Sequence, residues 1–307
     1  MHLISYINEF GLIMFIRNSL TRIMRKLKIS DSLINKFDCY KHKRIVKYLN
    51  LKYGKYISNV YSDSSIENIE RDCNIWIFWW QGEKKMPLIV KKCYESVKSN
   101  AKDHKVVLID KNNLNNYVDF PQFIYDRIET GNITITHFSD ILREKLLYMY
   151  GGIWMDATIF MTDPFPDSLY NNTYYTLNGA FKNWKWSGFF QASSKDNMFP
   201  KQIYKLFELY WKEHNELITY LLIDCFFELA YENNNKIKQM IDGLDKVDDS
   251  IFCLNDKMLD LPFDEKMFNE LKDKSNIHKL SYKFKHTEEI DGKSTFYKEI
   301  INGKITG

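Results

Sequence analysis

The chain has 307 residues, of which 45% are hydrophobic, so it can bury a large core in one domain, with or without an extension. Its 43 basic and 40 acidic side chains leave a formal charge of only +3, which does not indicate a nucleic-acid partner. Its five cysteines are odd in number, scattered and without the spacing of a zinc site, which favours a reducing, cytoplasmic location without structural zinc.

Residues 1–28 combine apolar and basic side chains at helical spacing. Glu9 and Arg17 interrupt the apolar run, which is far shorter than the roughly 20 residues that a spanning helix needs, and no signal-peptide cleavage site follows. The apolar stripe contains Leu12, Phe15, Ile16, Leu20 and Ile23, and the basic flank contains Arg17, Arg22, Arg25, Lys26 and Lys28. Such a helix either packs on the main domain or lies on an anionic bilayer, as a peripheral contact at the inner face of the plasma membrane.

A second basic helical stretch, KHKRIVKYLNLKYGKYI, follows at residues 41–57. We therefore predict a helical N-terminal extension over residues 1–70 and one larger domain over residues 71–307. The segment SDSSIEN at residues 62–68 is the best candidate for the boundary, because its small polar residues interrupt the pattern.

Residues 74–160 alternate between apolar runs and helical patterns. The runs NIWIFWW (74–80), KVVLID (105–110) and IWMDATIF (153–160) predict buried strands. Helical periodicity predicts helices over residues 88–100, 121–129 and 139–150, the last capped by Ser139 and ended by Gly151 and Gly152. This order indicates an α/β fold with an open, mainly parallel sheet, in which ligands bind at the carboxyl ends of the strands.

Three acidic or basic side chains near the third predicted strand have spacings that suit a site. In an apolar strand, the carboxylate of Asp156 is costly unless a metal, a hydroxyl, an arginine or backbone amides pair with it. If the strand continues through residue 157, Asp156 and Thr158 share a face and can address one ligand. Asp140 and Arg143 are three apart in the predicted first helical turn. They form either a surface ion pair or a site in which the carboxylate accepts from hydroxyls and the guanidinium neutralises phosphate.

Three blocks of the sequence resemble the capsular polysaccharide synthesis proteins, relatives of family 32 of the glycosyltransferases. The blocks are IWIFWWQGEKKMPLIVKKCYESVKSN (75–100), SDILREKLLYMYGGIWMDAT (139–158) and, more weakly, IHKLSYKFKH (277–286). The resemblance implies a GT-A fold, in which a Rossmann-like α/β domain binds a nucleotide sugar. It also implies a retaining glycosyltransferase that moves a sugar from a nucleotide-sugar donor, with a UDP-sugar favoured, to a growing capsular or other cell-surface polysaccharide. The acceptor is then a glycan or a lipid-linked oligosaccharide.

The resemblance also assigns roles to individual residues. Asp156 takes the first position of the D-x-D motif of these enzymes, and Asp140 and Arg143 hold sugar hydroxyls and the diphosphate. Trp80 borders the base of the nucleotide. The implied donor site further contains Gln81, Gly82, Gly152, Trp154 and Lys283.

The third position of the D-x-D motif is Thr158 here, where most relatives have a metal-binding carboxylate. The resemblance implies a Mn²⁺ or Mg²⁺ ion that neutralises the leaving diphosphate. With one carboxylate missing, Asp156 binds this ion through water, with His286 as a further ligand. Alternatively, the basic side chains of Lys283, Lys285 and His286 supply more of the positive charge.

Residues 170–235 are expected to form the acceptor side. Asn178, Trp184 and Trp186 lie in a loop-like aromatic stretch that suits a sugar. Asp224 interrupts a strongly apolar helix predicted over residues 216–232, so it makes either a structural hydrogen bond or a catalytic contact with the reacting sugar.

Two other classes of function stay open at this point. The change to Thr158 suggests a non-catalytic sugar-binding or assembly-scaffold protein with the same fold. A metal-dependent phosphohydrolase that uses Asp156 is the other alternative, and the lack of clustered His and Asp ligands in the sequence counts against it.

Overall fold

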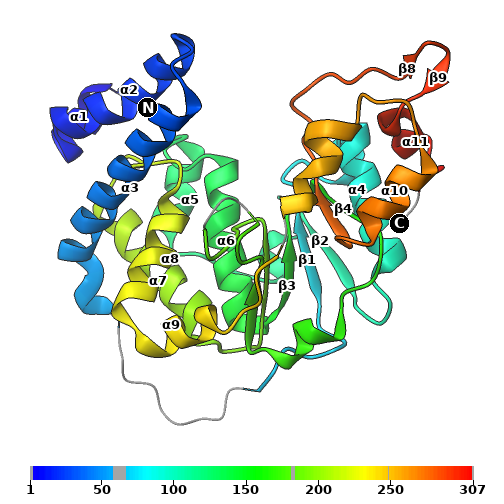
Figure 1. Ribbon diagram of the computed structural model, residues 1–307. Coiled ribbons are helices and arrows are strands. Elements are labelled where there is room, and N and C mark those ends of the chain that lie inside the picture. Colours follow the sequence, from blue (N-terminus) through cyan, green and yellow to red (C-terminus); the bar gives the residue numbers. More distant parts are fainter. Residues whose placement is uncertain (1–2, 58–66, 181–183, 248, 306–307) are drawn as a thin grey trace. The chain divides into compact units, whose positions relative to one another are not determined.

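The computed structural model describes residues 3–57, 67–180, 184–247 and 249–305 (Figure 1). The chain forms two compact units, each assembled from three stretches. The first unit contains residues 1–64, 119–145 and 198–239, and the second contains residues 65–118, 146–197 and 240–307. Helices α6 (Ile135–Tyr150) and α9 (Asn235–Asp242) supply residues to both units. The candidate boundary at residues 62–68 lies largely outside the described residues.

The regular elements of the first unit are all helices, within its described residues. Besides parts of α6 and α9 it contains α1 (Leu3–Phe10), α2 (Leu12–Lys26), α3 (Asp31–Tyr53), α5 (Gln122–Glu129), α7 (Met198–Glu213) and α8 (Leu222–Asn233). Helices α3 and α7 both pack against α8. The buried hydroxyl group of Tyr6 donates a hydrogen bond of 2.8 Å to the carbonyl of Ile218, which anchors α1 to the segment before α8. Residues 3–53 are mainly helical, and they belong to one unit with residues 119–145 and 198–239, whereas the sequence pattern predicted a separate extension over residues 1–70.

The second unit is built on a five-stranded sheet with the strand order β2-β1-β3-β6-β5 (Figure 1). The strands are β1 (Ile75–Phe78), β2 (Val106–Ile109), β3 (Gly152–Met155), β5 (Tyr174–Thr176) and β6 (Phe190–Ser193). Strand β1 runs parallel to β2 and β3, whereas β6 runs antiparallel to β3 and β5. Four of these five strands therefore point the same way, which confirms the predicted α/β class with a mainly parallel sheet. Strands β1 and β3 are buried along their whole length, which is why both are continuous apolar runs.

Smaller elements complete the second unit. Its other elements are α4 (Leu88–Asn100), α10 (Glu265–Lys272), α11 (Phe296–Ile301), the antiparallel pair β4 (Ile159–Met161) and β7 (Ile277–Lys279), and the antiparallel pair β8 (Glu289–Ile290) and β9 (Lys293–Ser294). Short 3₁₀ turns lie at Gly54–Tyr56 in the first unit and at Glu83–Lys85, Leu114–Asn116, Asp167–Asn171 and Asp249–Phe252 in the second, with a π turn at Leu254–Met258. Helix α4 packs against β4 and α11 and buries Ile89, Val90 and Val97.

Helix α6 begins four residues earlier than predicted. The side-chain oxygen of Thr134 accepts from the backbone N–H of His137 at 3.2 Å, and its carbonyl accepts from Phe138 at 2.8 Å. Thr134 therefore caps the helix, and Ser139 lies inside it, where its hydroxyl group donates to the carbonyl of Thr136. Asp140 consequently lies in the second helical turn and not in the first.

The predicted strand over residues 153–160 is interrupted at Asp156. Strand β3 ends at Met155, and the carbonyl of Asp156 accepts from the N–H of Ile159 at 2.9 Å, which closes a β-turn. The chain then continues as β4, which pairs with β7 and not with the central sheet. The periodicity of the apolar residues is the same on both sides of the turn, so the sequence pattern contains no sign of the break.

The two glycines before β3 are required by close backbone approaches. Gly151 and Gly152 have φ angles of +66° and +100°, a region that favours glycine. A Cβ atom on Gly152 would lie 2.5 Å from the carbonyl oxygen of Asn74, and one on Gly151 would lie 2.6 Å from the backbone nitrogen of Lys195. The N–H of Gly151 bonds to the carbonyl of Leu147, so the predicted role of these glycines at the end of the helix is confirmed.

Candidate active site

Asp156 directly follows strand β3 and therefore lies at the carboxyl end of the central sheet. The backbone N–H of Asp156 donates to the carbonyl of Phe189 at 2.9 Å, which holds Asp156 next to the first residue of β6. The indole N–H of Trp154 donates to Oδ1 of the carboxylate at 3.1 Å. Trp154 is only 1% exposed, so its ring lies in the core and can influence a ligand only through its hydrogen bond to Asp156. The carboxylate itself keeps 30% of its side-chain surface exposed, so a ligand can reach it.

Lys279 binds both polar side chains of the turn. Its ammonium lies 2.7 Å from Oδ2 of Asp156 and 2.8 Å from the hydroxyl oxygen of Thr158. The pairing of Ile159 with Lys279 in the β4–β7 ladder sets this position, and the ring of Phe189 lies 5.1 Å from the ammonium. Asp156 and Thr158 thus contact one group, the ammonium of Lys279, although the strand between them is broken. Sequence reasoning missed Lys279, and the only available signal was its place in the IHKLSYKFKH block.

The predicted metal ligands do not assemble in this structure. The Nδ1 atom of His286 lies 3.0 Å from Oδ2 of Asp260, whose Oδ1 accepts from the N–H of Thr287. Among the described residues, no group of three or more His, Cys, Asp and Glu side chains could hold a metal ion. The contacts of Asp156 include the indole N–H of Trp154 and the ammonium of Lys279, which also binds the hydroxyl of Thr158, and an ammonium repels a divalent cation. The described side chains around Asp156 do not fit the expected Mn²⁺ or Mg²⁺ site.

The loops that follow β1 and β2 form one continuous edge with the end of β3. Gly82 has a φ of +79°, and its N–H closes a turn onto the carbonyl of Trp79. The N–H of Lys111 donates to the carbonyl of Trp80 at 3.2 Å, and a Cβ on Gly82 would lie 2.9 Å from Oδ2 of Asp110. Trp80 is half-buried, and the neighbouring Gln81 is exposed. The predicted donor residues 80–82 therefore lie at the carboxyl ends of parallel strands, where α/β folds bind ligands.

The segment after β7 carries the other predicted basic residues. Lys283 and Lys285 are exposed. Tyr282 is 43% exposed, and its ring meets the ring of Trp79 edge to face at 5.5 Å. This contact ties the segment to the end of β1 within the second unit.

Asp140 and Arg143 form a buried ion pair in the first unit. Nη1 of Arg143 lies 3.1 Å from Oδ1 of Asp140, and Arg143 is only 3% exposed, so the pair is not the surface pair of the structural alternative. The indole of Trp211 donates to Nε2 of His137 at 3.0 Å. Since Nε2 accepts, the neutral ring carries its proton on Nδ1, which faces Asp140 at 3.7 Å. Sequence reasoning missed His137, although its position three residues before Asp140 places it on the same helix face.

Asp224 lies in the first turn of α8, because this helix begins at Leu222 and not at residue 216 as predicted. The predicted picture of a buried aspartate in the middle of a helix is therefore wrong. The side chain is half-buried, and the helix N-terminus favours a carboxylate at this position.

The aromatic stretch predicted to bind the acceptor is mainly structural in its described residues. The amide of Asn178 donates to the carbonyl of Leu244 at 3.0 Å, and Trp186 is only 6% exposed. The rings of Trp184 and Trp186 meet edge to face at 6.2 Å. Of these three residues, only Trp184 presents a substantial part of its surface.

Residues 25–300 match the protein family described as capsular polysaccharide synthesis protein. The chain belongs to this family. All three blocks that carried the resemblance lie inside the matched range, so the recognition from sequence is confirmed.

Two known proteins are similar to parts of this chain. The O-glycosyltransferase braB of Annulohypoxylon truncatum is 27% identical over 166 residues, which make up 47% of this chain and 38% of that protein. The chain thus spans less than half the length of this curated relative. Among solved structures, the PaToxG glycosyltransferase is 18% identical, with a TM-score of 0.39 over 64% of this chain and 81% of the other. Within the described residues, no helix combines the length and the apolar character needed to cross a bilayer.

Proposed function

We propose that this protein is a retaining glycosyltransferase that moves a sugar from a nucleotide-sugar donor, preferably a UDP-sugar, to a growing capsular or other cell-surface polysaccharide. The acceptor in this proposal is a glycan or a lipid-linked oligosaccharide. The observation that carries the proposal is the partly exposed carboxylate of Asp156 at the carboxyl end of β3, in a chain of the capsular polysaccharide synthesis family. The description of the relative braB as an O-glycosyltransferase supports the same class of reaction.

The described contacts leave Asp156 able to bind a sugar. An ionised carboxylate offers about four lone-pair sites, and the hydrogen bonds from Trp154 and Lys279 use two different oxygens. The part of the carboxylate that stays exposed can accept a hydrogen bond from a hydroxyl of the donor. The exposed edge at Trp80 and Gln81 suits the base and ribose, because aromatic rings stack on bases. Asp140, which keeps 17% of its side-chain surface exposed, and Arg143 remain proposed donor-binding residues.

The test is a screen of nucleotide sugars for thermal stabilisation, followed by a turnover assay with each stabilising compound. A ligand at 100 times its Kd adds about 2.7 kcal/mol to the free energy of unfolding, which is easily detected. We expect one or more nucleotide sugars to stabilise the protein and to release nucleoside diphosphate when an acceptor glycan is present. Binding without turnover on any acceptor would favour the non-catalytic sugar-binding protein, for which the threonine at position 158 is the motivating feature.

We also propose that helix α2 lies on an anionic bilayer at the inner face of the plasma membrane. Four of the five apolar residues of the predicted stripe are exposed by more than a third of their surface. They are Leu12 (56%), Ile16 (52%), Leu20 (37%) and Ile23 (50%), and they are joined by Ile13 (67%) and Leu27 (68%). The stripe is flanked by the basic residues Arg17, Arg25, Lys26 and Lys28. Their positive charge favours acidic lipid headgroups as the partner of this helix face.

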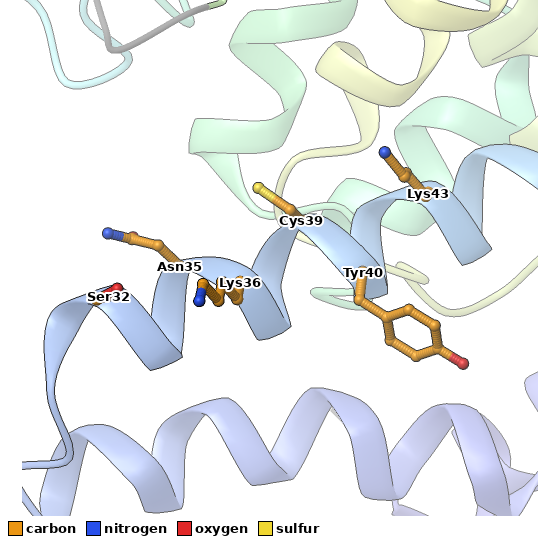
Figure 2. A pocket seen from close by; sticks show the side chains of 6 residues that line it. All are labelled: Ser32, Asn35, Lys36, Cys39, Tyr40 and Lys43. Carbon is orange, nitrogen blue, oxygen red and sulfur yellow. The ribbon is translucent and has the colours of Figure 1, made fainter.

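Helix α3 adds positive charge in the same unit. A shallow hollow on α3 is lined by Ser32, Asn35, Lys36, Cys39, Tyr40 and Lys43, all from this one helix (Figure 2). The ring of Tyr40 is 47% exposed, and the guanidinium of Arg17 lies 5.6 Å from its centre. Tyrosine, lysine and arginine side chains are favoured at the level of lipid headgroups. The hollow therefore fits the proposed bilayer contact better than a small-molecule site.

A further inference from the structure

The ammonium of Lys279 contacts the side chains at the first and third positions of the D-x-D-like motif. It donates one N–H to Asp156 and one to Thr158. A lysine ammonium has three N–H donors, and the third has no acceptor among the residues that the structure describes. The side chain of Lys279 is 22% exposed, so a ligand can reach this third donor.

We infer that Lys279 binds the diphosphate of the donor and supplies there the positive charge for which the relatives' motif uses a second carboxylate and a metal. The inference rests on the proposed function and specifies how that site recognises its donor. Thr158 is central to the argument, because its neutral hydroxyl accepts from the ammonium without adding negative charge. An aspartate at this position would place a second negative charge beside the phosphates and would call for a divalent cation.

The chemistry of transfer requires such a charge. The bond between the anomeric carbon and the diphosphate oxygen breaks, and its electron pair remains on that oxygen. The acceptor hydroxyl oxygen bonds to the anomeric carbon, and its proton passes to the departing diphosphate. A fixed ammonium stabilises the charge that develops on the leaving oxygen. In this scheme Asp156 and Thr158 orient Lys279, and Lys279 contacts the reacting group.

The contacts of Lys279 hold the ammonium in place before any ligand binds. Three independent groups restrict it, namely the carboxylate of Asp156, the hydroxyl of Thr158 and the ring of Phe189. The backbone of Lys279 is held by the β4–β7 ladder, and the next residue, Leu280, donates its N–H to the carbonyl of Thr158 at 2.9 Å. A pre-oriented cation loses little side-chain entropy on binding phosphate. Exposed lysines such as Lys283 and Lys285 have no comparable support among the described contacts.

The test is calorimetric binding of inorganic pyrophosphate and of UDP to the full chain in excess EDTA. We expect the wild type to bind both probes without metal and Lys279→Met to weaken both by about ten- to hundredfold, the usual loss for a hydrogen bond to a charged group. Lys279→Arg should retain most of the affinity. The matched control is Lys274→Met, which removes an exposed lysine just before β7 and should leave binding unchanged.

A second variant keeps the test decisive if Lys279→Met folds poorly. Asp156→Asn removes a negative charge near the bound phosphates, while Thr158 and Phe189 still hold the ammonium. In EDTA we therefore expect Asp156→Asn to bind pyrophosphate as tightly as the wild type or more tightly, whereas a metal-mediated site would lose affinity. Loss of affinity in Lys283→Met but not in Lys279→Met would also overturn the inference.

The outcomes separate this inference from the proposed function. If the wild type binds the probes only when manganese or magnesium is added, Lys279 is not the diphosphate cation, and the glycosyltransferase proposal stands. If neither probe binds under any condition, the proposed donor site itself is wrong. Unchanged pyrophosphate affinity in folded Lys279→Met would show that the lysine is only a structural partner of Asp156.

Discussion

The ammonium of Lys279 lies 2.7 Å from the carboxylate of Asp156, although 123 residues separate them in the chain. Strand β4 comes directly after the turn that begins at Asp156. The three-residue strand β7 pairs with β4, and this pairing brings Lys279 to Asp156. The charge state of the candidate active site therefore depends on the C-terminal part of the chain. This relationship and the burial of Arg143 decide how the predictions below are designed.

Replacement of the carboxylate should abolish transfer without unfolding the protein. We expect Asp156→Asn to lower kcat/KM on the order of a hundredfold or more, because an amide cannot accept hydrogen bonds at both positions of the carboxylate. The measurement is release of nucleoside diphosphate in the presence of acceptor, with thermal unfolding as the control for folding. Undiminished transfer in Asp156→Ala would reduce the residue to a structural anchor for the turn after β3.

Arg143 should contribute to stability as well as to donor binding. Because its side chain is 3% exposed and paired with Asp140, Arg143→Met leaves a partly buried carboxylate without this partner. Breaking such a pair costs about 3 kcal/mol or more. We therefore expect a clear loss in chemical denaturation, and partial recovery when Asp140→Asn is added to Arg143→Met.

The matched control for the Arg143 prediction is an exposed ion pair of similar spacing. Lys266 and Glu270 are 3.9 Å apart and largely exposed, so Lys266→Met should change stability little. Equal effects of Lys266→Met and Arg143→Met would contradict the importance of the buried pair. If Arg143→Met retains full specific activity per folded molecule, the ion pair is structural and does not hold the donor.

His278 should make the protein less stable in mild acid. Burial lowers the pKa of its imidazole from 6.5 to about 4, and its Nε2 contacts the hydroxyl of Thr162 at 3.4 Å within the β4–β7 pair. The folded state therefore favours the neutral ring, whereas the unfolded chain takes up a proton below about pH 6.5. The contribution to stability is present above that pH and is lost as the pH falls toward 4, by at most about 3 kcal/mol.

The measurement for His278 is the free energy of unfolding by urea between pH 4 and pH 7, for the wild type and for His278→Gln. We expect the glutamine variant to show a smaller decrease in stability toward low pH, since its side chain does not titrate. Parallel pH profiles for the two proteins would show that other groups cause the acid sensitivity.

The exposed stripe on α2 should carry the membrane contact. Deleting residues 1–28 is a poor test, because Tyr6 is buried and Glu9 pairs with His214 in the first unit. We propose instead Ile13→Asn with Ile16→Asn, which removes apolar surface that is 67% and 52% exposed. Sedimentation with anionic vesicles should fall, and the binding that remains should weaken further with salt.

The control for the vesicle experiment is Leu51→Asn, which changes an 81% exposed leucine at the end of α3, outside the stripe. This variant should sediment like the wild type. Equal sedimentation of the stripe variant and the control would show that α2 does not bind the bilayer. Sedimentation with neutral vesicles as strong as with anionic ones would remove the proposed role of the basic flank.

Local features of the sequence determined the elements on which the candidate site is built. Strands β1 and β2 and helix α4 were predicted within a few residues of their observed bounds, because the runs around Trp76 and Val107 are uniformly apolar and polar residues flank them. The glycine pair before β3 was also predictable, since a left-handed backbone after a helix depends on neighbouring residues only. The motif residues singled out Asp156, although the predicted strand continued through it, and the family followed from the same motifs.

Tertiary structure alone decided which groups meet at the site. The break at Asp156, the choice of Lys279 over Lys283 and the pairing of His286 with Asp260 all depend on contacts between segments far apart in the chain. The burial of Arg143 and the start of α8 before Asp224 depend on packing between helices. Hydrophobic periodicity records which face of an element is buried, but it carries no information about which distant side chain lies against that face. The partner of a charged residue is set by strand pairing and packing, which a local pattern does not encode.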